Sequence, residues 1–153
     1  MNAAEEINRI SRRMREVVGD TLRKKGVVVA VSGGIDSSVC AALSVRALGA
    51  SRVLALILPE ADSSPESWAR GEILCRHLGV RSEATNITPI LSAFGCYRWR
   101  DEAIRAVFPE FGPGWKSKIV LSGSPLEGDR INFFKVVIRN PSATGWSTTR
   151  GSS

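Results

Sequence analysis

The sequence has only one histidine and three cysteines among its 153 residues. The cysteines, Cys40, Cys75 and Cys96, are widely spaced and form no CxxC pair, which argues against a disulfide framework and against a zinc site. The lone histidine, His77, excludes a metal site built from several histidines and is interpreted as a surface or capping residue. Cys40 and Cys75 are expected to be buried, reduced thiols, as in a cytoplasmic protein.

Long apolar runs are also lacking. No stretch of 18 apolar residues is present, so we predict neither a membrane-spanning helix nor a membrane partner. The first ten residues include Glu5 and Glu6 and have no apolar core, so they are not expected to be a secretory signal. With 43% hydrophobic and 24% charged residues, the composition is that of a globular protein, and the predicted location is the cytoplasm.

Basic side chains outnumber acidic ones by six, and the excess lies at both ends of the chain. Residues 1–26 hold seven basic and four acidic side chains, residues 27–96 hold five and six, and residues 97–139 hold eight and five. A solvated face of an arginine-rich protein is the favoured interpretation, and an RNA or nucleotide-phosphate partner is the alternative. No run of five like charges marks a nucleic-acid arm, so nucleic acid is a disfavoured partner that the sequence leaves open.

Strands and helices are expected to alternate over the first 90 residues. Apolar residues at steps of three and four from Ile7 to Leu22 predict an amphipathic helix, and Ser64 followed by Pro65 predicts the start of a later one. The first two expected strands are continuously apolar, as strands covered on both faces are. This order predicts an α/β fold with a parallel sheet. The expected strands are 27–31, 52–58 and about 82–87, and the helices between them are about 37–48 and 64–78.

The patterns weaken beyond residue 88. Short helices are expected there first, followed by a loop and by a segment that fits a strand or a helix equally well. The helices are 89–94 and 101–108, the loop is 109–114, and the ambiguous segment is 131–138.

We predict a single α/β domain over residues 1–139, irregular toward its C-terminal part. Segment 97–139 is interpreted as a lineage-specific insertion whose tryptophans pack in a core instead of stacking on bases. Half of the residues in 140–153 are serine or threonine, and this segment is predicted to be a disordered tail.

The most informative segment is the string Ser-Gly-Gly-Ile-Asp-Ser-Ser at residues 32–38, between the first strand and a helix. Its two glycines permit unusual backbone conformations and a close approach to a ligand. Backbone N–H groups at a helix N-terminus bind anions, and the serine hydroxyls add donors. The carboxylate of Asp36 repels phosphate on its own, but beside Mg²⁺ and a triphosphate it becomes a metal ligand. The alternative is an ordinary strand-turn-helix junction with Asp36 as the helix cap.

This string resembles the signature of the N-type ATP pyrophosphatases. Three further segments resemble the NAD⁺ synthase family in particular, and the resemblance covers about residues 5–90: Leu58-Pro59-Glu60-Ala61-Asp62-Ser63-Ser64, Leu78-Gly79-Val80 and Asn86-Ile87-Thr88-Pro89. The resemblance implies a Rossmann-like parallel sheet with helices on both faces. It also implies an ATP site in which Asp36 binds Mg²⁺ and in which Leu58 and Pro59 lie near the adenine. The ATP-binding residues it implies are Ser32, Gly33, Gly34, Ile35, Asp36, Ser37, Ser38, Leu58 and Pro59.

The implied reaction adenylates deamido-NAD⁺ with ATP, releases pyrophosphate and admits ammonia as the nucleophile. The resemblance also suggests a homodimer, but it identifies no catalytic residue. A Gly-Thr-rich segment with a glutamate, expected later in this family, is not found. Because the chain then changes into a Ser/Thr-rich stretch, we expect a truncated product that holds half of an active site. Two alternatives stay open, a tRNA-modifying or other adenylating enzyme and an inactive nucleotide-binding module.

Overall fold

The computed structural model describes residues 2–122, 133–142 and 144–148. The chain divides into two compact units, residues 1–90 and 91–153. The boundary lies close to the point where the sequence patterns weaken. The prediction of a single domain over residues 1–139 stays a prediction, and so do the insertion at 97–139 and the disordered tail at 140–153. Parts of these last two segments lie outside the described residues.

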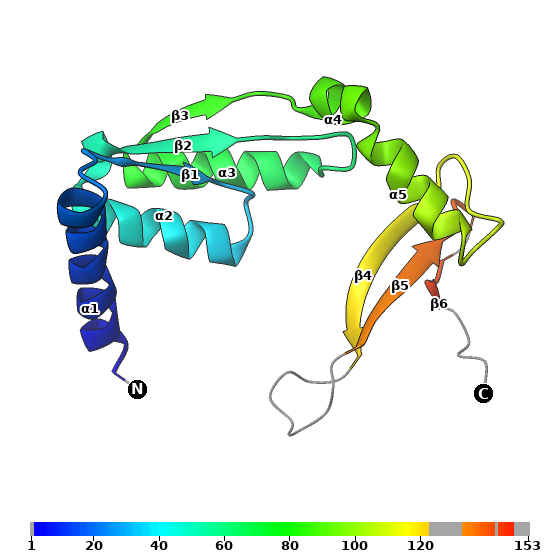
Figure 1. Ribbon diagram of the computed structural model, residues 1–153, viewed down its shortest axis with the longest axis horizontal. Coiled ribbons are helices and arrows are strands. Elements are labelled where there is room, and N and C mark those ends of the chain that lie inside the picture. The colour runs from blue at the N-terminus through cyan, green and yellow to red at the C-terminus, as the bar shows by residue number, and fades with distance from the viewer. Residues whose placement is uncertain (1, 123–132, 143, 149–153) are drawn as a thin grey trace. The chain divides into compact units, whose positions relative to one another are not determined.

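The first unit alternates strands and helices as predicted (Figure 1). Both β1 and β3 pair with β2 in parallel, so the sheet has the order β1-β2-β3. The predicted α/β class with a parallel sheet flanked by helices is therefore confirmed. In chain order the elements are α1 (Ala3–Arg15), the π-helix η1 (Glu16–Thr21), β1 (Val27–Ala30), α2 (Ile35–Leu48), the 3₁₀ helix η2 (Ala50–Arg52), β2 (Val53–Ile57), α3 (Pro65–Leu78) and β3 (Arg81–Ala84).

The two faces of this sheet differ. Helices α2 and α3 lie on the same side of the strands (Figure 1), and the core between them and the sheet includes Val53, Ala55 and Ile57, each at most 4% exposed. On the opposite face Val28 is 61% exposed. The expectation that the first strand is covered on both faces is thus wrong for β1, because α2 and α3 cover only one side of it.

The cysteine and histidine predictions have mixed outcomes. Cys75 is buried in α3, and this burial raises the pKa of its thiol, so the predicted buried thiol is confirmed there. Cys40 is exposed, and the prediction that it is buried is wrong, because α2 buries Ala41, Ser44 and Ala47 instead. His77 is an exposed residue in the last turn of α3, as expected.

The second unit contains an antiparallel sheet of order β4-β5-β6. The ambiguous segment 131–138 proves to be a strand from Phe133 onward, whereas the strand at residues 116–122 was not predicted. Trp115 packs against a core of Ile104, Phe108, Phe111 and Ile138, so packing is confirmed as the role of this tryptophan. The remaining elements are α4 (Thr88–Phe94), which spans the boundary, α5 (Cys96–Arg105), β4 (Lys116–Ser122), β5 (Phe133–Arg139) and β6 (Ser147–Thr148).

None of the helices in the part of the chain that the structure describes has both the length and the apolar character needed to cross a bilayer.

Replacing Gly26 by alanine is expected to lower the free energy of unfolding by about 1–3 kcal/mol. A Cβ at this position would lie 2.3 Å from the backbone oxygen of Arg52, so the chain entering β1 would have to move away from the start of β2. Gly19→Ala in η1 is the matched control, since its Cβ would meet no atom within 4 Å. Urea unfolding of both variants checks this, and equal losses of stability would contradict it.

Candidate functional site

The predicted phosphate loop lies at the carboxyl ends of the parallel strands, where ligands of such sheets bind. A hollow of about 450 Å³ opens at this edge. Of the predicted site residues, Ser32, Leu58 and Pro59 line it together. The rest of the loop follows Ser32 directly but does not line the hollow, and Ile35 is 79% exposed to solvent.

Gly33 brings the loop against the first turn of α3. Its φ angle is +75°, a conformation that other residues rarely adopt. A Cβ on Gly33 would lie 2.2 Å from the backbone oxygen of Ser67. The sequence suggested that this glycine allows close approach to a ligand, whereas the neighbour it accommodates in the structure is the protein's own backbone.

The N-terminus of α2 is open to an anion. Its N-cap is Gly34, which has no side chain to accept a hydrogen bond from the first-turn N–H groups. Those groups have no partner within the helix, and together with the helix dipole they favour a negative charge. The alternative in which Asp36 caps this helix is wrong, because Asp36 lies within the first turn, after the N-cap.

The hydroxyl groups of two serines form hydrogen bonds with the backbone of the loop. The hydroxyls of Ser37 and Ser38 donate to the backbone oxygen of Gly34 at 3.1 and 2.8 Å, and the backbone N–H of Ser32 donates to Ser37 Oγ at 3.2 Å. Phosphate contacts by these hydroxyls stay a prediction, and they require the two hydroxyl hydrogens to turn away from Gly34.

Asp36 supplies an exposed carboxylate at the same helix end. Among the described residues there is no group of three or more His, Cys, Asp or Glu placed to hold a metal ion. One carboxylate still fits Mg²⁺, since this ion is commonly held by one or two carboxylates together with substrate phosphates. The donor set therefore suits a metal that arrives with a nucleotide and does not suit a permanently bound one.

The first turn of α3 completes the hollow and was missed as a site by sequence reasoning. Ser64, Ser67 and Trp68 line it, and Trp68 is 38% exposed. Ser64 is the N-cap, as predicted, because Ser67 N–H donates to its hydroxyl oxygen at 3.2 Å. Both α2 and α3 begin at the carboxyl edge of the sheet, where ligands bind. The predicted order of strands and helices already implied this, so it could have shown that the first turn of α3 lines the site.

The carboxyl group of Glu66, in the first turn of α3, is charged at neutral pH. Hydrogen bonds from its own backbone N–H, and then from Ser64, hold its pKa below the ordinary value. The first turns of the two helices each carry one acidic side chain, Glu66 in α3 and Asp36 in α2. The two ends differ in their caps, because the Ser64 hydroxyl oxygen accepts from Ser67 N–H in α3, whereas the N-terminus of α2 has no side-chain cap. Of the two helix ends, α2 therefore has more N–H groups free for a phosphate and is the better phosphate site.

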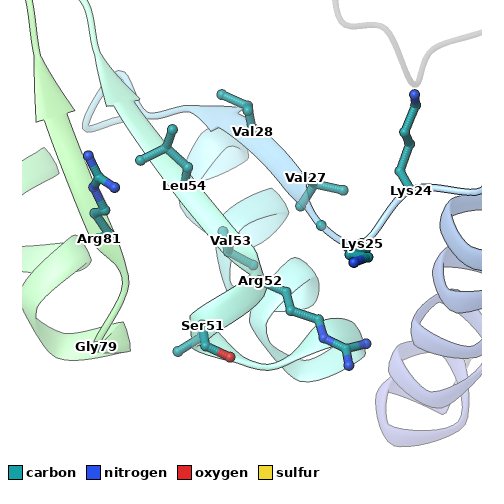
Figure 2. Close-up of a pocket in the computed structure, with 12 residues that line it drawn as sticks. Lys24, Lys25, Val27, Val28, Ser51, Arg52, Val53, Leu54, Gly79 and Arg81 are labelled. Carbon is teal, nitrogen blue, oxygen red and sulfur yellow. The ribbon is translucent and has the colours of Figure 1, made fainter.

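A larger hollow, of about 1000 Å³, lies at the opposite, amino edge of the sheet (Figure 2). Lys24, Lys25, Arg52 and Arg81 line it. Figure 2 shows the side chains of Lys24 and Arg52 pointing in different directions, and Arg81 pairs with Glu83 at 2.7 Å. These cations do not converge on one point as the groups of an anion site do, so the carboxyl edge is the better candidate.

Comparison with known proteins identifies a family. The family model described as NAD synthase matches residues 6–107. The NH₃-dependent NAD⁺ synthetase of Rhizobium rhizogenes is 43% identical over 141 residues, which are 92% of this chain and 42% of the relative. The corresponding synthetase of Rhizobium meliloti is 49% identical over 121 residues, 79% of this chain and 36% of the relative. The chain thus spans well under half the length of these curated relatives.

A solved structure agrees in fold. The NH₃-dependent NAD synthetase from Campylobacter jejuni superposes with a TM-score of 0.50 at 27% identity, covering 67% of this chain and 49% of that chain. The similarity to the Rhizobium rhizogenes enzyme spans 92% of the chain and so extends into segment 97–139. That segment is therefore shared at least in part with this relative.

Proposed function

Because this chain belongs to the NAD synthase family, we propose that it binds ATP and serves the ATP-dependent amide ligation of NAD⁺ synthesis. In that reaction the carboxylate of deamido-NAD⁺ attacks the α-phosphorus of ATP, and pyrophosphate leaves. Ammonia then attacks the acyl adenylate, forming the amide and releasing AMP. The observation that carries this proposal is the uncapped N-terminus of α2 beside the hollow at the carboxyl edge of the sheet.

The residues of the chain have distinct parts in this proposal. First-turn N–H groups of α2 and the loop from Ser32 to Gly34 bind the pyrophosphate portion of ATP. Leu58 and Pro59 form an apolar wall for the adenine, and Leu58 is 39% exposed in the free protein. Backbone donors that are already in place cost no reorganisation when negative charge develops on the leaving group.

Magnesium is proposed to enter with ATP, with Asp36 as its one protein ligand among the described residues. When bound, the ion neutralises charge on the phosphate oxygens. Asp36 lies one residue beyond Ile35, the first residue of α2, so its carboxylate and the first-turn N–H groups act on the same phosphates.

Release of pyrophosphate from ATP tests the proposal against its alternatives. We expect release that requires Mg²⁺ and rises when deamido-NAD⁺ is added. Stimulation by tRNA instead would favour a tRNA-modifying enzyme, which the basic excess at both ends of the chain supports. Nucleotide binding without release under either condition would favour a binding module, which the short span relative to the curated relatives supports. Absence of ATP binding would overturn all three.

Assembly and location also remain proposals. We propose a homodimer, which sedimentation of the purified chain tests directly. A cytoplasmic location is supported by the three free cysteines.

A further inference from the structure

The two faces of the antiparallel sheet in the second unit differ. Residues that pair directly opposite one another on two antiparallel strands lie on the same face. On one face Ile138 is fully buried, in a core with Ile104 and Phe108. Side chains alternate along each strand, so Arg139, the next residue of β5, and its partner Lys116 in β4 lie on the other face.

Four cations lie on that other face. The same alternation places Lys118 there, two residues along β4 from Lys116, and Lys135, four residues along β5 from Arg139. We call Lys116, Lys118, Lys135 and Arg139 the basic face. None of them forms an ion pair with a carboxylate of the described residues. Lys116 and Arg139 are directly opposite, and like charges in this position destabilise a sheet. Such an unfavourable pair indicates that the charge has a use other than folding.

The helix α5 of the same unit differs, because its positive charges are compensated. Its three arginines all pair with carboxylates of that helix: Arg98 with Glu102 at 3.6 Å, Arg100 with Asp101 at 2.9 Å and Arg105 with Asp101 at 3.9 Å. Within the described residues, the basic excess of segment 97–139 therefore lies on the sheet. A solvated, charge-paired surface describes α5, whereas the alternative drawn from the sequence, a partner that carries phosphates, suits the basic face.

An aromatic ring lies among these cations. Trp146 directly precedes β6 and is 39% exposed. Lys118 Nζ lies 4.1 Å from the centre of its ring, and the guanidinium carbon of Arg139 lies 5.2 Å from it. Cation–π attraction holds both charges beside the indole, which reduces the freedom they would lose on binding a ligand. Cations beside an exposed aromatic ring are the combination by which proteins bind single-stranded nucleic acid, through its phosphates and its unpaired bases.

We propose that the basic face binds single-stranded nucleic acid, with phosphates on its four cations and one unpaired base stacked on Trp146. The base replaces one of the two cations over the ring, and that cation becomes free to contact a phosphate. A double helix is the poorer ligand, because its bases are stacked within the duplex and offer no ring to Trp146. This binding goes beyond amide ligation and does not depend on it, since none of these residues lines the hollow proposed for ATP.

Fluorescence anisotropy of the full chain with labelled oligouridine and oligothymidine, each of about 12 nucleotides, tests the proposal without ATP. Four phosphate contacts on a single strand predict that the logarithm of the binding constant falls with the logarithm of the salt concentration, with a slope of about −3. Lys118→Gln is expected to make this slope shallower by about 0.7. Arg98→Gln is the matched control, because it removes the same charge from a cation of the same unit that is already paired with Glu102, and its slope should equal that of the wild type.

The aromatic contact is tested by Trp146→Ala. This variant is expected to bind about tenfold more weakly at an unchanged slope, because it loses a stacking contact and no charge. Trp99→Ala on α5, where Trp99 is 56% exposed, should bind as the wild type does. If Trp146→Ala fails to fold, the slope of Lys118→Gln still decides, since Lys118 is exposed.

Binding of either oligonucleotide with these slopes supports the proposal, and absence of binding to both at about 50 mM salt overturns it. Polyglutamate that competes as well as oligouridine, with no effect of Trp146→Ala, would show a general surface for polyanions instead. Preference for vesicles of anionic lipid would assign the face to a membrane. A change of slope in Lys24→Gln but not in Lys118→Gln would place the binding at the amino edge of the first sheet.

Discussion

Replacing Gly33 by alanine is expected to weaken ATP binding and to destabilise the first unit. Two effects act together at this position. The φ angle of +75° is unfavourable for any residue with a Cβ, and that Cβ would lie 2.2 Å from the backbone oxygen of Ser67. We expect a loss of about 2–4 kcal/mol in the free energy of unfolding and a weakening of ATP affinity by about tenfold or more.

The neighbouring glycine provides the control for stability. Gly34 has an ordinary φ of −85°, and a Cβ added there would have Ser32 Oγ as its nearest neighbour, at 3.4 Å. Gly34→Ala is therefore expected to cost about 1 kcal/mol or less. Urea unfolding and calorimetric titration with ATP measure the two quantities separately. If both variants lose the same stability, the close approach of Gly33 to α3 is not what fixes the loop.

The contrast between these glycines shows where sequence reasoning stops. The string at residues 32–38 predicted a strand, a tight loop and a helix, because those features depend on neighbours in sequence. Ser64 and Pro65 predicted the start of α3 for the same reason, and the hydrogen bond from Ser67 N–H to Ser64 Oγ confirms it. Nothing local reveals that Gly33 must pass the backbone of Ser67, which lies on another helix.

The missed strand has a similar explanation. Residues 116–122 begin with alternating lysine and serine and show no clear apolar face. They form a strand because each residue pairs with one in β5, from Lys116 with Arg139 to Ser122 with Phe133. Such pairing is set by a distant segment, so neither composition nor periodicity could have located β4.

Strand β1 shows the opposite case, in which the sequence predicts more burial than the described structure contains. The apolar run of β1 indicates cover on both sides, yet Val28 is exposed. Patterns of burial record the environment in which a strand is finally packed, including layers supplied by other segments.

Replacing Asp36 by asparagine is expected to remove the effect of Mg²⁺ on nucleotide binding while leaving the fold intact. Asparagine has nearly the same shape but no charge. Asp36 is exposed in the first turn of α2 and forms no ion pair with another described residue, so the fold loses no such contact. With Mg²⁺ present, the variant should bind ATP about tenfold more weakly than the wild type, because the carboxylate no longer helps to hold the ion.

The same substitution should act in the opposite direction when the metal is chelated. Without Mg²⁺ the carboxylate of Asp36 only repels the phosphates, so Asp36→Asn should bind ATP as tightly as the wild type or more tightly. Asp20→Asn, an exposed aspartate in η1, controls for a general change in charge. Calorimetric titrations in Mg²⁺ and in EDTA give the four affinities needed. Equal dependence on Mg²⁺ in the wild type and in Asp36→Asn would remove Asp36 from the metal site and leave the backbone N–H groups of α2 as the proposed phosphate contacts.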